Sequence, residues 1–551
     1  MSPKIALRIV LCLFSIALTL SASAAVRLPD VIASHMVLQQ KMEVPIWGFA
    51  NPNEQVTVKF RDQQKTAVAD SQGKWMVKLD PLLPGDPATL TVSGENTLTL
   101  EDVLVGEVWL GSGQSNMDTA VSMYAAEDPA LNAAMNEPHP QLRLFHLIAN
   151  DGWNPATPDK VNKFSAQLFY FGMLLQKELN VPVGLMQSAQ GGSPSFPFIS
   201  QEAFDADATI QPLLVKWDAD HPLEIEQKKY EDAHDKWKTD IAAAIAANAS
   251  NPPASPDQTV PPADSAAPAA APSATVITTL GPVDKAIAAK YPEPKPPTLA
   301  TETKTGQIFE KQVRPLIPYA IRGVLWDQGE SGTGVPCLDQ PTLMSALMRS
   351  WRQDWGQGDF PWIYVEKPSG RGCALNPDDP VNSGAMPFAP LPSPLPPGFA
   401  VSVTEGYRIS MFPNTFLTIT SDLANGIHPI NKSGYATRDS KVALGAVYGE
   451  PIEYYGPIFE SLTADGNQIV VSFTHAGQGL TTLPNQKLQG FAIAGADKKW
   501  HWADAAIVGQ TVVLSSPDVP APVAARYWPA AWADLFNLDG LPALGFSTDI
   551  P

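Results

Sequence analysis

The chain has 551 residues, more than one hydrophobic core usually supports, so we expect two or three domains. It carries 37 Lys and Arg against 56 Asp and Glu, a formal net charge of −19. A surface this acidic repels phosphate backbones and anionic lipid, so we expect neither nucleic acid nor a membrane as a partner.

The first 24 residues have the pattern of a secretory signal peptide. Lys4 and Arg8 are basic, residues 9–20 form an apolar run, and residues 22–24 are small enough for a signal peptidase. The run is shorter than the roughly 18 apolar residues that a membrane span needs. We therefore expect a secreted or periplasmic protein, and an uncleaved anchor is the alternative.

Apolar patterning divides the remaining chain into three parts. Short apolar runs between Asn, Asp, Gly and Pro turns predict a β-sandwich over residues 25–104. Over residues 105–450, apolar strands alternate with helical patterns, which is typical of an α/β fold with a doubly wound parallel sheet. The clearest helices are predicted over residues 167–179, 342–355 and 432–448. Residues 451–551 return to strands and turns, which predicts a C-terminal β-rich domain.

Residues 200–305 interrupt the α/β pattern and are interpreted as an insertion. A charged, Ala-rich helix is predicted over residues 224–248. The Pro/Ala/Ser-rich stretch 251–274 lacks the apolar residues that offset ordering entropy, so we expect it to be disordered or extended. A second Pro-rich stretch, residues 388–399, is predicted to be a long surface loop.

Two of the three cysteines remain after the signal peptide is removed with Cys12. Cys337 and Cys373 are an even number in an oxidising compartment, which favours one disulfide between them. Two buried free thiols are the alternative.

Four polar motifs follow apolar strands of the α/β segment, and the carboxyl ends of parallel strands meet at one crevice. They are residues 111–117 (GSGQSNM), 188–193 (SAQGGS), 326–331 (WDQGES) and 426–429 (GIHP). Each alone has an ordinary explanation, as a turn, a helix cap or a structural histidine. Their convergence on one crevice favours a catalytic site.

Ser115 and His428 are the candidate nucleophile and base. Ser115 lies on a turn flanked by glycine, where its hydroxyl can attack an acyl carbon if a base removes the proton. His428 is the only one of eight histidines in a loop that follows an apolar strand of the α/β segment. Histidine is the side-chain type best suited to act as a general base near neutral pH. The sequence has no metal-ligand spacing and no phosphate loop, so we expect no metal and no cofactor.

The second and third motifs hold candidates for binding a developing oxyanion. A backbone N–H at Gly191 or Gly192 and the side-chain amide of Gln328 are suitable donors. Glu330 is placed to orient neighbouring groups.

The four motifs and their flanks resemble the sialate O-acetylesterases, within the SGNH hydrolase superfamily. The matching flanks are residues 35–39, 44–48, 73–75, 104–110, 351–361, 490–497 and 540–543. The resemblance covers the mature chain apart from residues 200–305 and 374–400. It implies a flavodoxin-like SGNH core, serine esterase chemistry through an acetyl-enzyme, and acetylated carbohydrates as substrates.

The resemblance also implies roles for individual residues. Ser115 would be the nucleophile and His428 the base. The backbone N–H groups of Ser115 and of Gly191 or Gly192 would form the oxyanion hole together with the side chain of Gln328.

The chain departs from the pattern of these relatives near the base and in the expected sugar pocket. Relatives commonly carry an Asp two or three residues before the histidine, where this chain has Gly426 and Asn425. Asp422 and Glu330 are the candidates to replace that acid. The residues expected to line the pocket, several of them different from the usual ones, are Gln114, Asn116, Gln190, Phe196, Phe198 and Asp327.

We therefore expect a secreted serine esterase that deacetylates sialic acid or a plant-type polysaccharide. The departures near His428 and Gly192 motivate an alternative, a carbohydrate-binding protein that keeps the fold with weakened catalysis. A different esterase or lipase on the same core is disfavoured because both β flanks match. The sequence leaves the oligomeric state open.

Overall fold

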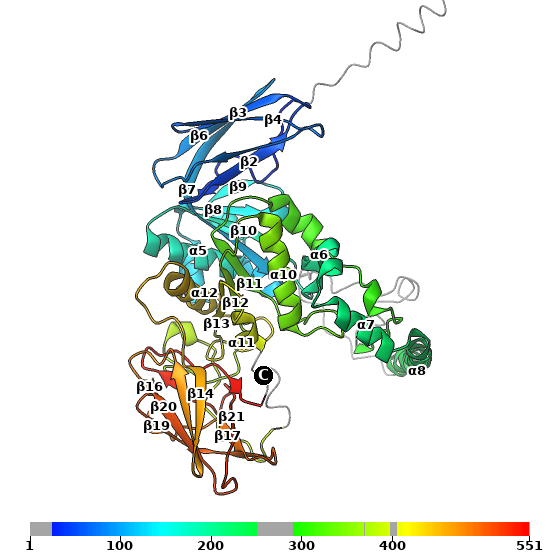
Figure 1. Cartoon of the computed structure of the whole chain (residues 1–551), viewed down its shortest axis with the longest axis vertical. Helices are drawn as coiled ribbons and strands as arrows, with labels where there is room; N and C mark the ends of the chain where they lie inside the picture. Colours follow the sequence, from blue (N-terminus) through cyan, green and yellow to red (C-terminus); the bar gives the residue numbers. More distant parts are fainter. Residues whose placement is uncertain (1–24, 251–289, 368–369, 397–404, 550–551) are drawn as a thin grey trace, which may run out of the picture.

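The computed structural model describes residues 25–250, 290–367, 370–396 and 405–549. The predicted signal peptide, the stretch 251–274 and the end of the second Pro-rich stretch lie outside these residues. The molecule is elongated, with a β unit at each end and an α/β layer between them (Figure 1). Within the described ranges, no helix has both the length and the apolar character that crossing a membrane requires.

The N-terminal β unit is built from short strands whose side chains alternate between core and solvent. In β3, for example, Val56, Val58 and Phe60 are buried while the intervening residues are not. β2 pairs with β5, and β4, β3, β6 and β7 pair in that order. The strands are β1 (Val37–Gln39), β2 (Val44–Phe49), β3 (Gln55–Phe60), β4 (Gln63–Val68), β5 (Lys74–Leu79), β6 (Ala88–Ser93) and β7 (Thr97–Gly113).

Strand β7 belongs to the N-terminal β unit and to the central sheet at once. Its first half alternates in burial and pairs with β6, whereas its second half is buried throughout and pairs with β10 and β11. A single hydrophobic core accordingly extends through the β unit and the α/β layer. The chain therefore enters the central sheet without a linker.

The central layer is a largely parallel sheet in the order β13-β12-β11-β7-β10-β8, with β9 antiparallel at one edge. This confirms the predicted α/β class with a large parallel sheet. The added strands are β8 (His139–His146), β9 (Trp153–Ala156), β10 (Val183–Ala189), β11 (Gly323–Asp327), β12 (Trp362–Val365) and β13 (Thr415–Thr418).

Helices cover the sheet and extend to one side of it. The predicted helices around residues 167–179, 342–355 and 432–448 are present as α5, α10 and α12 with a following π turn. In the predicted insertion, α6 to α8 project sideways from the central layer (Figure 1). The α-helices are α2 (Ser115–Asp118), α3 (Pro129–Met135), α4 (Pro158–Val161), α5 (Ala166–Leu179), α6 (Gln201–Ala206), α7 (Gln211–Asp220), α8 (Leu223–Ser250), α10 (Gln340–Trp355), α11 (Glu405–Ser410) and α12 (Lys432–Val442).

The C-terminal β unit has a hydrophobic core of its own, which includes Ile469, Phe491 and Val512. It contains two four-stranded sheets, ordered β14-β15-β20-β19 and β18-β17-β21-β23, and the short pair β16-β22. Its strands are β14 (Ile458–Asp465), β15 (Gln468–Thr474), β16 (Leu480–Thr481), β17 (Phe491–Ala494), β18 (Trp500–Trp502), β19 (Asp504–Val508), β20 (Thr511–Ser515), β21 (Ala524–Tyr527), β22 (Phe536–Asn537) and β23 (Phe546–Ser547).

The predicted disulfide is wrong, because Cys337 and Cys373 are both free. Cys373 is buried against the C-terminal unit, where its thiol donates to the carbonyl of Ala533 at 3.3 Å. Burial raises the pKa of Cys373 to about 12. Cys337 is only half-buried and lies near Asp218 of α7. The two thiols thus pack against different parts of the chain.

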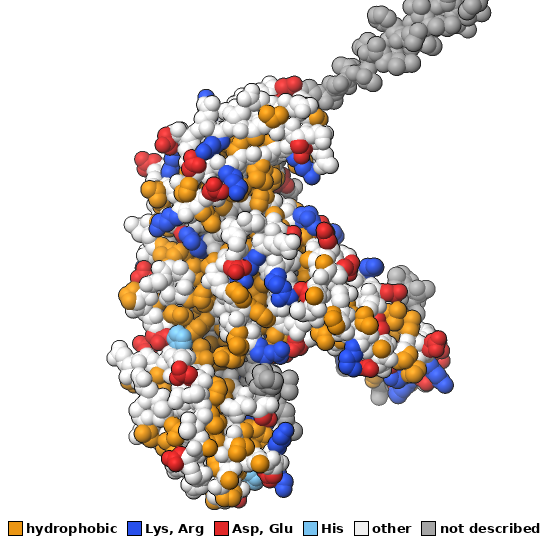
Figure 2. Space-filling view, in the orientation of Figure 1, with side chains coloured by type: hydrophobic (Ala, Val, Ile, Leu, Met, Phe, Trp, Pro, Cys, Tyr) orange, Lys and Arg blue, Asp and Glu red, His pale blue; other side chains and the backbone are white. Residues whose placement is uncertain are grey.

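Charged side chains of both signs are interspersed over the face shown in Figure 2, and no large basic patch appears on it. Acidic residues outnumber basic ones in the sequence, but side chains of both signs are present on this face.

Candidate active site

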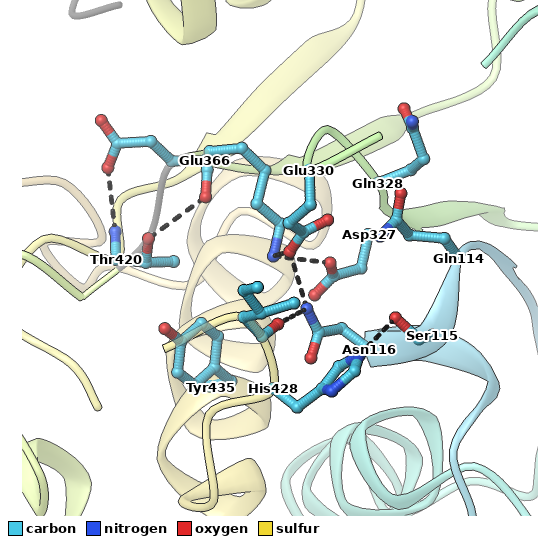
Figure 3. Close-up of polar contacts among 12 residues, drawn as sticks. Gln114, Ser115, Asn116, Asp327, Gln328, Glu330, Glu366, Thr420, His428 and Tyr435 are labelled. Carbon is cyan, nitrogen blue, oxygen red and sulfur yellow. Dashed lines mark hydrogen bonds and ion pairs between the residues drawn. The ribbon is translucent and has the colours of Figure 1, made fainter. Parts of the chain in front are cut away.

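Ser115 and His428 meet at the carboxyl edge of the central sheet. Ser115 is the first residue of α2, directly after β7, and His428 lies in the loop between β13 and α12. Nε2 of His428 is 2.8 Å from Oγ of Ser115 (Figure 3). This distance is suitable for proton transfer from the hydroxyl to the imidazole.

The sharp turn before Ser115 depends on glycine. Gly113 has φ +128°, and a Cβ atom there would lie 2.2 Å from the carbonyl oxygen of Asp327 on the neighbouring strand β11. The next residue, Gln114, donates its backbone N–H to that same carbonyl at 2.9 Å. Close contact between β7 and β11 therefore fixes where the hydroxyl of Ser115 emerges.

Neither predicted acid contacts the imidazole. The carboxylate of Asp422 is fully buried and binds the guanidinium of Arg438 through two contacts of 3.0 Å and the amide of Asn382 at 2.7 Å. These partners anchor α12 to the end of β13. Glu330 binds Asn116 at 2.7 Å and Lys367 at 2.8 Å. Among the described residues, no carboxylate hydrogen-bonds to Nδ1 of His428.

Asn116 connects the nucleophile's helix to the loop of His428. Its Nδ2 donates to Glu330 (Figure 3) and to the backbone carbonyl of Ile427 at 3.0 Å. Its Oδ1 accepts from Nζ of Lys432 at 2.6 Å. Asn116 is itself buried, so these three contacts satisfy its amide inside the protein. Asn116 thus fixes the residue that immediately precedes the histidine.

A buried group of charges lies behind Asn116. Lys367 is 2.8 Å from Asp327 and from Glu330. Burial opposes its charge, but these two carboxylates hold the pKa of Lys367 well above its usual range. Burial instead lowers the pKa of Lys432 to about 7, against the smaller opposing effect of Asp327. The ammonium of Lys432 also lies 4.9 Å from the ring of Tyr124.

The predicted oxyanion donors differ in whether another acceptor already binds them. Among the described residues, no acceptor is hydrogen-bonded to the backbone N–H of Ser115 or Gly192. Gln328 is fully buried, and its Nε2 donates to the carbonyls of Gly332 at 3.0 Å and Ser193 at 3.4 Å. Its side chain points away from the Ser115–His428 pair (Figure 3). The prediction of Gln328 as an oxyanion donor is therefore wrong.

The backbone N–H of Gly191, the remaining predicted oxyanion donor, is already bound by Asp118. Its Oδ2 accepts from the N–H of Gly191 at 3.0 Å. A Cβ atom on Gly191 would lie 3.7 Å from Cβ of Ser115, so this carboxylate is close to the nucleophile. Burial raises the pKa of Asp118, with the N–H of Gly191 acting in the opposite direction.

The residues predicted to line the sugar pocket lie in different environments. Gln190 is exposed beside the site and accepts from Gln312 at 3.0 Å. Phe196 is half-buried, next to Gly334. Phe198 and Asp327 are fully buried, Phe198 packing edge-to-face on Trp326. Phe198 and Asp327 therefore do not line a pocket.

Gln114 is also buried, as Asn116 is, and accepts from the backbone N–H of Ser331 at 3.3 Å. It links the end of the third motif to the nucleophile turn.

A cavity of about 480 Å³ lies next to the histidine loop. A second cavity of about 480 Å³ shares Gly329 and Glu405 with it. The first is lined by Gly329, Glu330, Tyr364, Lys367, Arg371, Glu405, Asn425, Gly426 and Ile427. Polar and charged side chains dominate this lining, which suits a hydrated, hydroxyl-rich ligand better than an apolar one.

Three polar residues near the site were not singled out from the sequence. Lys367 follows the apolar strand β12, so the same strand-end criterion that found the four motifs also applies to it. Asp118 comes three residues after the nucleophile on α2, a spacing that places both on one helical turn. Lys432 lies on the first turn of α12. Because lysine is rarely buried, its sequence position predicted an exposed side chain and not a residue near the site.

In the described part of the chain, no cluster of three or more His, Cys, Asp or Glu residues is arranged to hold a metal ion. The contact that is arranged for chemistry is the one between Ser115 and His428.

A parallel α/β sheet with a serine–histidine pair at the carboxyl ends of its strands has the architecture of a serine hydrolase. No family model matches the chain. Two curated relatives named sialate O-acetylesterase, from Pongo abelii and Homo sapiens, are each 24% identical over 588 residues, covering 96% of this chain and 94% of the relative. The Mus musculus protein of the same name is 24% identical over 563 residues, 93% of this chain and 91% of its own.

A solved structure described as a novel carbohydrate acetylesterase from Xanthomonas citri matches with a TM-score of 0.67 and 24% identity, covering 96% of this chain and all of that one. It shows that the two chains share a fold. The chain is thus homologous, over nearly its whole length, to proteins named sialate O-acetylesterase, which confirms the resemblance seen in the motifs. Its homologues and its Ser115–His428 pair support an esterase enzyme.

Proposed function

We propose that the protein is an exported serine esterase that removes O-acetyl groups from carbohydrates through an acetyl-enzyme intermediate. The observation that carries this proposal is the 2.8 Å contact between Oγ of Ser115 and Nε2 of His428. The homologues named sialate O-acetylesterase support the substrate class. Sialic acid and plant-type polysaccharides are the two candidate carriers of the acetyl group.

In the first half of the reaction, His428 accepts the hydroxyl proton of Ser115 while Oγ attacks the acetyl carbonyl carbon. The backbone N–H groups of Ser115 and Gly192 stabilise the oxyanion that forms. The imidazolium then donates its proton to the sugar oxygen, which leaves as a free hydroxyl.

In the second half, water takes the place of the sugar. His428 accepts a proton from the water as it attacks the acetyl-enzyme, and then returns that proton to Oγ of Ser115 as acetate leaves. No other group has to change its protonation state.

Asn116 holds the loop that carries His428, since its Nδ2 donates to the carbonyl of the preceding residue, Ile427, at 3.0 Å. His428 is exposed, and among the described residues its Nδ1 has no acid as a partner. Neutralising a triad carboxylate costs up to about 10⁴ in kcat, so turnover is expected to be slower than in a full triad. This same observation favours the second candidate function, a carbohydrate-binding protein with weakened catalysis.

The proposal is tested by hydrolysis of an aryl acetate with the wild type, Ser115→Ala, His428→Ala and the exposed control Ser122→Ala. We expect both site variants to lose about 10³-fold or more in kcat and the control to keep the wild-type rate. Acetate release from O-acetylated sialic acid and from an acetylated polysaccharide then identifies the carrier.

An inactive wild type that still binds deacetylated glycan in calorimetry would establish the second function instead. Wild-type activity in Ser115→Ala would refute the proposed mechanism. Export is tested separately, by sequencing the N-terminus of the secreted or periplasmic protein, which we expect to begin at Ala25.

A further inference from the structure

Asn425 and Gly426 form the only Asn-Gly pair in the sequence, and they lie in the loop that carries His428. Asn-Gly is the dipeptide most prone to deamidation in proteins, because glycine has no side chain to hinder attack by its own backbone nitrogen. Both residues are exposed, and a Cβ atom on Gly426 would meet nothing within 4 Å. The reaction therefore has room to occur in the folded protein.

The side chain of Asn425 is already folded onto the nitrogen that attacks it. Oδ1 of Asn425 accepts from the backbone N–H of Gly426 at 2.7 Å, which places the adjacent Cγ next to that nitrogen. Gly426 has φ +116°, a conformation that other residues rarely adopt. Its N–H has no other hydrogen-bond partner among the described residues that would hold it back.

We propose that Asn425 is a self-modification site, at which spontaneous deamidation places a carboxylate in the loop of the base. The nitrogen of Gly426 forms a bond to Cγ of Asn425, the Cγ–Nδ2 bond breaks, and ammonia leaves with the proton of that nitrogen. Water then opens the succinimide to Asp or to isoaspartate. The balance is one water consumed and one ammonia released, with no oxidation or reduction.

The consequence for activity rests on the proposed function. The new negative charge lies three residues from His428, whose Nδ1 has no carboxylate partner among the described residues. A nearby carboxylate stabilises the imidazolium that forms in the transition state. Deamidation to Asp therefore raises kcat/KM severalfold. The cations Lys367 and Arg371, which line the same cavity as Asn425, help to hold the new charge.

The modification is tested by mass spectrometry, independently of activity, on the Ser115→Ala protein. The protein is kept folded at 37 °C at pH 6 and at pH 8.5, and the tryptic peptide of residues 409–432 is fragmented. We expect acid at position 425, accumulating faster at pH 8.5. Asn425→Gln, whose longer side chain cyclises far more slowly, is the matched control. No acid at 425 while the unfolded protein deamidates there would overturn the proposal.

The effect on activity is tested with aryl acetate, comparing fresh wild type, aged wild type and Asn425→Asp. We expect the aged wild type to approach the higher kcat/KM of Asn425→Asp, and Asn425→Gln to remain unchanged on ageing. Acid at 425 with unchanged kcat/KM would refute the functional part of the proposal. If the fresh wild type, the aged wild type and Asn425→Asp all lack esterase activity, the proposed function fails, and the mass measurement still decides whether Asn425 is a modification site.

Discussion

Nε2 of His428 lies 2.8 Å from Oγ of Ser115, although 313 residues separate them in the sequence. Three strands at the centre of the sheet, β7, β10 and β11, end together and position the serine. The histidine instead depends on a loop between β13 and α12. The distance between His428 and Ser115 therefore depends on the contacts that hold this loop in place.

Asn116→Ala removes the side-chain hydrogen bond to the carbonyl of Ile427. We expect kcat to fall about 10²-fold with KM nearly unchanged, because a displaced base affects the reaction more than ground-state binding. The free energy of unfolding should fall by about 1–3 kcal/mol, since Lys432 loses its acceptor. Steady-state kinetics and urea unfolding measure both, with exposed Asn132→Ala as control. A change confined to stability would show that Asn116 does not position His428.

Asp118→Asn keeps an acceptor for the N–H of Gly191 and removes the charge beside the oxyanion. We expect kcat at pH 8 to rise about fivefold, which corresponds to about 1 kcal/mol of relieved repulsion. The gain should shrink as the pH falls and wild-type Asp118, whose pKa is raised by burial, becomes protonated. The pH profiles of kcat for both proteins test this, and a slower variant would indicate that the carboxylate assists the reaction.

Glu366→Gln should change how stability depends on pH. Burial raises the pKa of Glu366 from 4.5 to about 7. As the pH rises from 4.5 to 7, the folded protein holds this proton longer than the unfolded chain, so the wild type loses stability. We expect the Gln variant to be more stable than the wild type at pH 8, by at most about 3 kcal/mol, and equal to it near pH 4.5.

Urea unfolding of Glu366→Gln at several pH values, with exposed Glu231→Gln as control, measures this difference. A gap between Glu366→Gln and the wild type that does not change between pH 5 and pH 8 would contradict a buried titrating carboxyl.

The two cysteines should react as free thiols of unequal accessibility. Cys337 is half-buried, whereas Cys373 is buried and its pKa is raised to about 12. We expect a thiol reagent to label Cys337 in the folded protein and both residues only after unfolding. Reducing agent should leave the melting temperature unchanged. If the melting temperature fell on reduction and neither cysteine were labelled in the unfolded chain without reducing agent, the two residues would be linked by a disulfide after all.

The strand-end motifs were sufficient to predict the α/β class and the meeting of Ser115 with His428. Both follow from a general property of parallel sheets, whose carboxyl ends converge whatever lies between the strands. Hydrophobic periodicity likewise predicted α5 and α10, whose buried sides are largely apolar. Helix α12 was also predicted, although many of its buried residues are polar or charged.

The direction in which a side chain points could not be predicted in the same way. Gln328 follows a strand at the right edge, but Ser195 and Gln340 approach it from distant segments and draw its amide into the core. Asp422 is close to the histidine in sequence, but Arg438 on the following helix binds its carboxylate. Such orientations depend on contacts with other segments of the fold, which the residues next to Gln328 or Asp422 in the sequence do not reveal.

Strand β7 is a single continuous strand that starts in the N-terminal β unit and ends at Gly113, two residues before the nucleophile. Because β7 pairs with β6 and then with β10 and β11, one continuous strand joins the N-terminal unit to the edge of the sheet that carries the nucleophile. Any part of a long glycan that the N-terminal unit touches would be held at a constant distance from the hydroxyl of Ser115. On the proposed function, such a contact would set which acetyl group of a polymeric substrate lies at Ser115.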